Sequence, residues 1–150
     1  MKGVKTFYFD TSALLPYYRE EAVSGEIEKL LLSITPPVFI SDLTRVEFAS
    51  ALSRWVRMGE LTEAQANLVE NILLQDIQSK LLISLSLSPM HYRQAKRWLS
   101  SRKTLLRTLD ALQLACSLHH DSMMVTCDKI LHQAATLLGV PCMFIGSPTN

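Results

Sequence analysis

The chain has 150 residues, about the length of one domain and enough to bury roughly 70% of the surface that its unfolded form exposes. Apolar residues make up 48% of it, which predicts a globular protein and argues against intrinsic disorder. With 15 Lys and Arg against 14 Asp and Glu, the formal net charge of +1 neither favours nor excludes a nucleic-acid partner. We expect residues 1–150 to form one domain.

Apolar periodicity predicts strands that alternate with helices. A first strand of aromatic and β-branched residues stops at Asp10, and Ser12 is the expected N-cap of the helix that follows it. Further strands are expected at residues 38–40, 81–85, 123–126 and 140–145. Further helices are expected at about 22–33, from a cap at Ser41 or Asp42 to about 58, from a cap at Thr62 to about 79, at about 89–99, from a cap at Thr108, and at about 128–138. This alternation predicts a parallel sheet with helices on both faces.

Four acidic residues follow the strands of this predicted sheet. In a right-handed β-α-β crossover each helix starts near the carboxyl end of the preceding strand, so helix starts and strand ends share one edge. By this rule one edge of the sheet collects a strand-end acid, two acids in the early turns of helices and one directly after a strand: Asp10, Glu47, Asp110 and Asp128. Singly, Asp10 is explained equally well as a helix cap, and Asp110 and Asp128 as acids that gain from a helix dipole.

The gathering of these acids has an electrostatic consequence. Two carboxylates about 4 Å apart repel by ~4 kcal/mol at an effective dielectric near 20. Either some of them are protonated, or a basic side chain lies among them, or a metal ion does. Oxygen ligands without His or Cys favour a hard cation, Mg²⁺ or Mn²⁺.

Four segments in the same order carry a family resemblance. The chain resembles PIN-domain ribonucleases, and most closely the VapC-type toxins of type II toxin–antitoxin pairs. The segments that match are residues 9–15 (FDTSALL), 44–52 (TRVEFASAL), 106–115 (LRTLDALQLA) and 125–131 (VTCDKIL). Each segment is weak evidence by itself, but four in family order cover essentially the whole chain.

The resemblance implies a three-layer α/β/α PIN-like domain with a central, mainly parallel sheet of about five strands. It implies a metal-dependent endoribonuclease that uses Mg²⁺ or Mn²⁺ and cleaves single-stranded or loop RNA through a metal-activated water. Thr126 matches a family hydroxyl that helps to position Asp128 or the water, whereas Gln113 stands where many relatives have His. The acids carried over as catalytic and metal-binding residues are Asp10, Glu47, Asp110 and Asp128. A cognate antitoxin protein and a homodimer are the partners that the resemblance implies.

A basic cluster precedes Asp110. No Asp or Glu occurs from residue 77 to 109, and this span includes Arg102, Lys103 and Arg107, which we expect to contact the RNA backbone. A solvated helix face is the plainer explanation of its other bases. The four histidines share no metal-ligand spacing, and His119 and His120 are expected to interact with a helix dipole.

The cysteines and the hydropathy of the chain indicate the cellular compartment in which we expect the protein. Cys116, Cys127 and Cys142 form an odd set without C-x-x-C spacing, which argues against disulfides and against a zinc site of thiolates. No signal peptide is evident and no apolar run reaches the length of a membrane span, so we expect a cytoplasmic protein without a membrane partner.

Other functions fit these residues less well. A haloacid-dehalogenase phosphatase needs a second Asp where Ser12 stands, and a receiver domain needs an acidic pair at the first strand. A PIN nuclease of RNA processing and a catalytically inactive PIN interaction module are the alternatives within the family.

Overall fold

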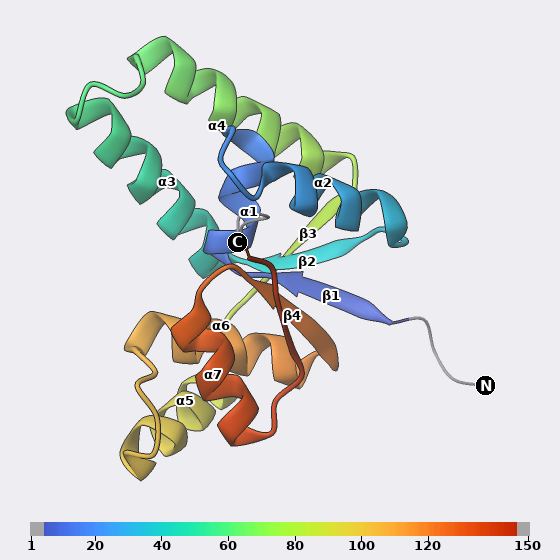
Figure 1. The fold of residues 1–150 in the computed structure, drawn as a ribbon, viewed down its shortest axis with the longest axis vertical. Helices are drawn as coiled ribbons and strands as arrows, with labels where there is room; N and C mark the ends of the chain where they lie inside the picture. Colours follow the sequence, from blue (N-terminus) through green and yellow to red (C-terminus); the bar gives the residue numbers. More distant parts are fainter. Residues whose placement is uncertain (1–4, 147–150) are drawn as a thin grey trace.

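The fold is a parallel sheet between two layers of helices, as described for residues 5–146 by a computed structural model (Figure 1). The strands are β1 (Thr6–Phe9), β2 (Val38–Ser41), β3 (Leu82–Leu85), β4 (Ser122–Thr126) and β5 (Cys142–Phe144). The helices are α1 (Thr11–Tyr18), α2 (Ser24–Ser33), α3 (Asp42–Arg57), α4 (Glu63–Gln78), α5 (Pro89–Ser101), α6 (Thr108–His119) and α7 (Lys129–Leu138). The strand order is β3-β2-β1-β4-β5, and every pairing is parallel. The predicted three-layer α/β/α class with about five strands is therefore confirmed.

Alternating side chains of β1 build the two halves of the core. Phe7 and Phe9 point into a cluster with α1, α2, α3 and α4, whereas Tyr8 lies in a second cluster with α5, α6 and α7. Figure 1 shows these two helical layers on opposite faces of the sheet. This is the period-2 pattern of a strand buried on both faces, which is why its sequence is almost continuously apolar.

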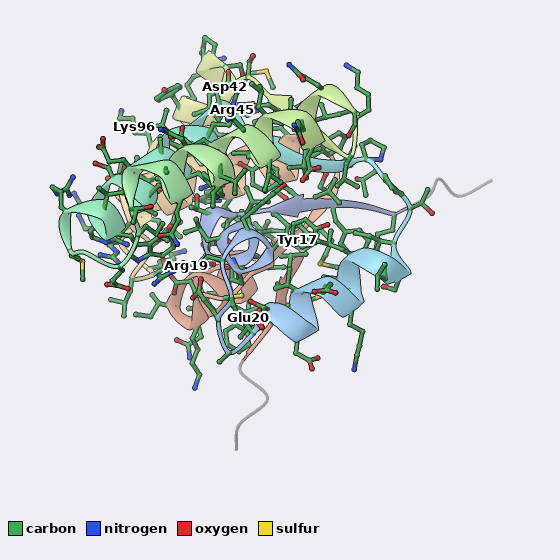
Figure 2. The ribbon with its side chains drawn as sticks, turned by 90° about the horizontal axis from the view of Figure 1, so that it is seen from above. Tyr17, Arg19, Glu20, Asp42, Arg45 and Lys96 are labelled. Atoms are coloured by element: carbon green, nitrogen blue, oxygen red, sulfur yellow. The ribbon has the colours of Figure 1, made fainter. Side chains whose placement is uncertain are left out.

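Local capping accounts for most of the helix boundaries. Ser41 accepts the N–H of Thr44 to cap α3, and Thr62, the predicted cap of α4, forms a capping box with Gln65. The loop between these helices makes a helical hairpin, which extends beyond the sheet in Figure 1. Arg19, at the end of α1 (Figure 2), lies 4.1 Å from the ring of Trp55 and 2.8 Å from Glu60, and so ties α1 to this hairpin.

Several predicted boundaries differ from the observed ones by one or two residues. Asp10 caps α1 instead of Ser12, and Arg107 instead of Thr108 is the N-cap of α6. The last strand spans Cys142–Phe144 and not 140–145. Val140 instead takes part in the C-terminal cap of α7, because its N–H donates to the carbonyl of Ala135 at 2.9 Å.

Candidate active site

Asp10 occupies the carboxyl end of the central strand. Its carboxylate is 4% exposed and accepts hydrogen bonds from Thr126 Oγ1 at 2.6 Å, Ser12 Oγ at 2.7 Å and the Ala13 N–H at 3.0 Å. Burial raises the pKa of Asp10 to about 7 against the pull of these three donors, and the charge of Asp110 raises it slightly further. The side chain is thus both the cap of α1 and a carboxylate held in one orientation.

Thr126 links Asp10 to Asp128. Its hydroxyl donates to Asp10 and accepts the N–H of Asp128 at 3.0 Å, so the end of β4 fixes both acids relative to each other. Asp128 caps α7 by accepting the N–H groups of Ile130 and Leu131 through Oδ1. Ser12, predicted as a cap, instead donates to Asp10 and accepts the N–H of Cys127 at 2.9 Å.

Glu47 is held by a polar network that the sequence did not predict. Thr11 Oγ1 donates to Glu47 Oε1 at 2.8 Å, and Gln113 Nε2 donates to the same oxygen and to Thr11 Oγ1. The amide oxygen of Gln113 accepts the hydroxyls of Tyr8 and Thr44, each at 2.9 Å. Because Oε1 of Gln113 only accepts, this pairing directs the amide nitrogen toward Glu47.

The hydroxyl of Tyr8 has two acceptors within reach. It lies 2.9 Å from Oε1 of Gln113 and 2.8 Å from Oγ of Ser41, so these two acceptors share its single proton. Gln113 is 2% exposed and uses both its oxygen and its nitrogen. The only sequence signal for it was a polar residue on the otherwise apolar inner face of a helix. The result is a Glu47 carboxylate with Oε1 bonded twice and Oε2 without a bond to residues 5–146.

Asp110 lies in the first turn of α6 and completes the group. Burial raises the pKa of Asp110 to about 6, the charges of Asp128 and Glu47 raise it further, and Arg107 opposes them. Glu47, Asp110 and Asp128 line one open depression of about 440 Å³ together with Arg107, Thr108 and Leu109. The structure therefore brings the four predicted acids to one edge of the sheet, three of them in the lining and Asp10 in electrostatic contact with Asp110.

The acids fit a divalent cation by their chemistry. Within residues 5–146 the one ion pair is Arg19–Glu60, so no basic side chain lies within 4.0 Å of any of the four carboxylates. Mutual repulsion among Glu47, Asp110 and Asp128 thus has no short-range compensation from the described part of the protein. The donor set is oxygen only, which suits Mg²⁺ or Mn²⁺ and not a thiophilic metal.

The three predicted RNA-contacting bases lie in two places. Arg107 lines the acid depression, whereas Arg102 and Lys103 border a second depression of about 230 Å³ next to α7. Arg102 is the C-cap of α5 and adopts a left-handed backbone at φ 55°. Ile130, two residues after Asp128, belongs to the lining of the second depression, so the two hollows are neighbours along the start of α7.

A separate cluster of histidines was also missed. His91, Cys116 and His120 each offer one ligand atom, and these atoms lie within 4.8 Å of one another. Cys116 and His120 lie one turn apart at the end of α6, but His91 comes from α5, so no spacing along the chain indicated all three.

Over the described residues no helix is both long and apolar enough to cross a membrane.

Solved structures with the same architecture include a toxin and a toxin–antitoxin complex. VapC20 of Mycobacterium tuberculosis, a sarcin-ricin-loop-cleaving toxin, aligns with a TM-score of 0.67 and 18% identity over 86% of this chain and 95% of its own. VapBC2 of Rickettsia felis, solved bound to a DNA fragment from its promoter, aligns with a TM-score of 0.66 and 14% identity over 93% of this chain and 98% of its own. FitAcB of Neisseria gonorrhoeae aligns with a TM-score of 0.61 and 16% identity over 92% of this chain and 96% of its own. At such identities the likeness establishes the fold alone.

Sequence comparison adds the family. No curated protein matches the chain. A family model of the PIN domain matches residues 7–137, which include all four acids and both halves of the core. The parallel sheet and the position of the acids at its carboxyl edge agree with that match. The chain belongs to the PIN domain family.

Proposed function

We propose that the protein is a divalent-metal-dependent endoribonuclease that acts as the toxin of a type II toxin–antitoxin pair. The observation that carries this proposal is the convergence of Asp10, Glu47, Asp110 and Asp128 at one sheet edge, where none of them forms an ion pair with the described residues. Four separate elements deliver these acids, and hydrogen bonds orient Asp10, Glu47 and Asp128. A set of helix caps has no need of such convergence, because each cap acts on its own helix.

The acids of the depression are the residues that would hold Mg²⁺ or Mn²⁺, with Asp10 beside them. When bound, such an ion neutralises charge on the scissile phosphate and lowers the pKa of a water molecule. Thr126 and Ser12 keep Asp10 in one orientation, and Thr11 with Gln113 leaves one oxygen of Glu47 free for the site. These orienting bonds bear directly on activity, since loss of a partner of a metal ligand commonly changes affinity or activity about 10- to 100-fold.

The bases around the site suit an RNA backbone. Arg107 lies in the same lining as the acids, and Arg102 with Lys103 borders the neighbouring depression. A chain of phosphates that crosses from one hollow to the other would pass these three cations. We propose RNA as the substrate, with single-stranded or loop segments favoured by the family resemblance.

An antitoxin protein is the proposed partner. The solved relatives include toxin–antitoxin complexes, such as VapBC2 of Rickettsia felis. In this chain a groove of about 460 Å³ lies between α3, the helix that carries Glu47, and α4, and Arg45 and Val46 belong to its wall. Val46 is 65% exposed, so this wall offers apolar area for a partner helix. We also propose that the protein forms a homodimer, on the strength of the family resemblance.

RNA cleavage with defined metals tests the proposal. Single-stranded RNA is incubated with the protein in Mg²⁺, in Mn²⁺ and in EDTA, and the triple variant Asp10→Asn, Asp110→Asn, Asp128→Asn is compared with the natural chain. Asp121→Asn is the matched control, because Asp121 is exposed, precedes the opposite end of β4, and has a positive φ that Asn tolerates. We expect cleavage only with metal and only when the three acids are present. Equal cleavage by the triple variant would overturn the assignment.

A further inference from the structure

The end of α6 that lies far from the acids gathers nitrogen and sulfur ligands. Asp110 and His120 are separated by about 15 Å along the helix axis at about 1.5 Å per residue. Around His120, the fully buried Cys116 lies one turn earlier on the same helix, and the 3% exposed His91 comes from the first turn of α5. One ligand atom from each of the three lies within 4.8 Å of the others.

His120 is oriented as metal-binding histidines usually are. Its Nδ1 lies 2.9 Å from the carbonyl oxygen of Cys116, which can only accept, so Nδ1 carries the ring proton. Nε2 is then left with its lone pair free in the neutral ring. A backbone carbonyl that fixes the tautomer in this way is the common second partner of a metal-ligating histidine.

A second observation points to a missing partner at the same place. Among buried side-chain nitrogen and oxygen atoms of residues 5–146, the one without a hydrogen-bond partner is Nδ1 of His119. The ring centroid of His91 lies 5.1 Å from that of His119 and 5.9 Å from that of His120. The rings of His119 and His120 therefore both lie beside that of His91, and an orphaned buried nitrogen calls for an ion, a water molecule or another ligand.

One hydrogen bond opposes coordination by His91. The N–H of Ser88 donates to His91 Nδ1 at 3.0 Å, which places the proton of the neutral ring on Nε2. Ligation through Nε2 would move this proton to Nδ1 and break the Ser88 bond. The ligand atoms would also have to approach to roughly 3.5 Å, the separation in a tetrahedral zinc site. The N–H of Ser88, the N-cap residue of α5, can replace the lost bond with one to water, because Ser88 is only part-buried at a helix start.

We propose that His91, Cys116 and His120 form a second metal site that takes a thiophilic divalent ion of the Zn²⁺ class, with the ring of His119 beside that of His91. The donor set disfavours Mg²⁺, which prefers oxygen, so the two ends of α6 take different metals. Bound metal clamps the start of α5 to the end of α6. It stabilises the folded protein by mass action, since the three ligands converge only in the fold.

Cobalt provides a direct probe of this site. Metal-free protein is titrated with Co²⁺, and the thiolate-to-cobalt charge-transfer absorption is followed together with the visible bands of tetrahedral Co²⁺. We expect one equivalent of Co²⁺ to give both features and Zn²⁺ to displace it. The measurement is made on the Asp10→Asn, Asp110→Asn, Asp128→Asn protein as well, so that Co²⁺ at the acids does not contribute.

Variants separate this site from other thiols and histidines. Cys116→Ser should abolish the charge-transfer band, and His120→Gln should weaken Co²⁺ binding by at least about 10-fold. Cys142→Ser and His132→Gln are matched controls outside the cluster and should leave binding unchanged. Because His120 is exposed, we expect the His120→Gln variant to fold even if Cys116→Ser, which alters a buried residue, fails to fold. Circular dichroism checks the folding of both variants. No charge-transfer band at one equivalent, or a band that persists in a folded His120→Gln at full affinity, would overturn the proposal.

Discussion

The two ends of α6 hold different chemistry on one rigid element. At its start, Asp110 joins three other carboxylates that hydroxyl, amide and backbone donors orient. At its end, Cys116, His119 and His120 meet His91, with a nitrogen that lacks a partner among the described residues. The difference shows that the hydrogen bonds a polar group makes or lacks help to indicate what kind of ligand it binds. The carboxylates at one end suit a hard cation that oxygen ligands prefer, whereas the nitrogen and sulfur atoms at the other end suit a thiophilic one, and both sites are our proposals.

Asp10→Asn is expected to produce the largest effect at the acid end. The amide removes a charge from the site while it can still cap α1, so we expect metal-dependent RNA cleavage to fall by more than about 100-fold, beyond what loss of an orienting partner alone costs. Initial cleavage rates of the natural and variant proteins measure this. The contrast between the ends predicts that Co²⁺ binding at the Cys116 end is unchanged in the same variant, and a parallel loss there would show that the ends are coupled.

Gln113→Leu should come next. The change removes the amide donor to Glu47 and leaves the buried hydroxyls of Tyr8 and Thr44 without their acceptor. We expect the free energy of unfolding to drop by ~1–3 kcal/mol and cleavage to fall about 10- to 100-fold. Chemical denaturation and cleavage rates are the two measurements. Gln75→Leu, on the exposed side of α4, is the matched control and should change neither by more than a small amount.

The acid end should also make stability depend on pH in the absence of metal. Asp10 has a pKa of about 7 in the folded protein and an ordinary value of 3.8, so the folded state binds more protons than the unfolded state between these values. Stability must then decrease as pH rises from about 4 to about 7, and Asp110 with its pKa of about 6 adds to the trend. Thermal unfolding in EDTA at pH 5, 6, 7 and 8 measures it.

The same pH series contains its own control. Asp10→Asn has no proton to lose at this position, so its unfolding midpoint should fall less steeply from pH 5 to pH 8 and exceed that of the natural chain at pH 8. Added Mg²⁺ should flatten the natural curve by stabilising the ionised acids. A midpoint that rises with pH in EDTA would contradict the picture of an uncompensated buried carboxylate.

The smallest expected effect concerns the bases beside the acid end. Arg102→Ala with Lys103→Ala should weaken RNA binding severalfold and reduce its dependence on salt, by roughly 0.7 in the logarithmic slope for each phosphate that the protein no longer neutralises. Fluorescence anisotropy with a catalytically inactive background measures binding at two or more salt concentrations. Lys29→Ala with Arg57→Ala, which removes two cations from other helices, is the control. Identical salt slopes for the two pairs would remove Arg102 and Lys103 from the RNA-binding surface.

The sequence by itself determined the sheet, its alternation with helices and the edge on which the four acids lie. These features follow from short-range rules: β1 is apolar on both faces, Ser41 and Thr62 cap helices, and a crossover brings helix starts to strand ends. Asp10, Glu47, Asp110 and Asp128 share that edge in the structure because topology alone brings them to it. The resemblance to PIN domains rested on the same positions, and the family match covers them.

Only the tertiary structure decided how these groups are held. Ser12 donates to Asp10 instead of capping α1, since the strand-end acid itself accepts the free N–H of Ala13. Gln113 reaches Glu47 across 66 positions of sequence, and His91 reaches His119 across two packed helices. Such contacts depend on side-chain direction after the layers have packed, and no periodicity or spacing along the chain encodes them. Local rules thus fix where the chain turns and which edge collects charge, whereas packing fixes which atoms meet.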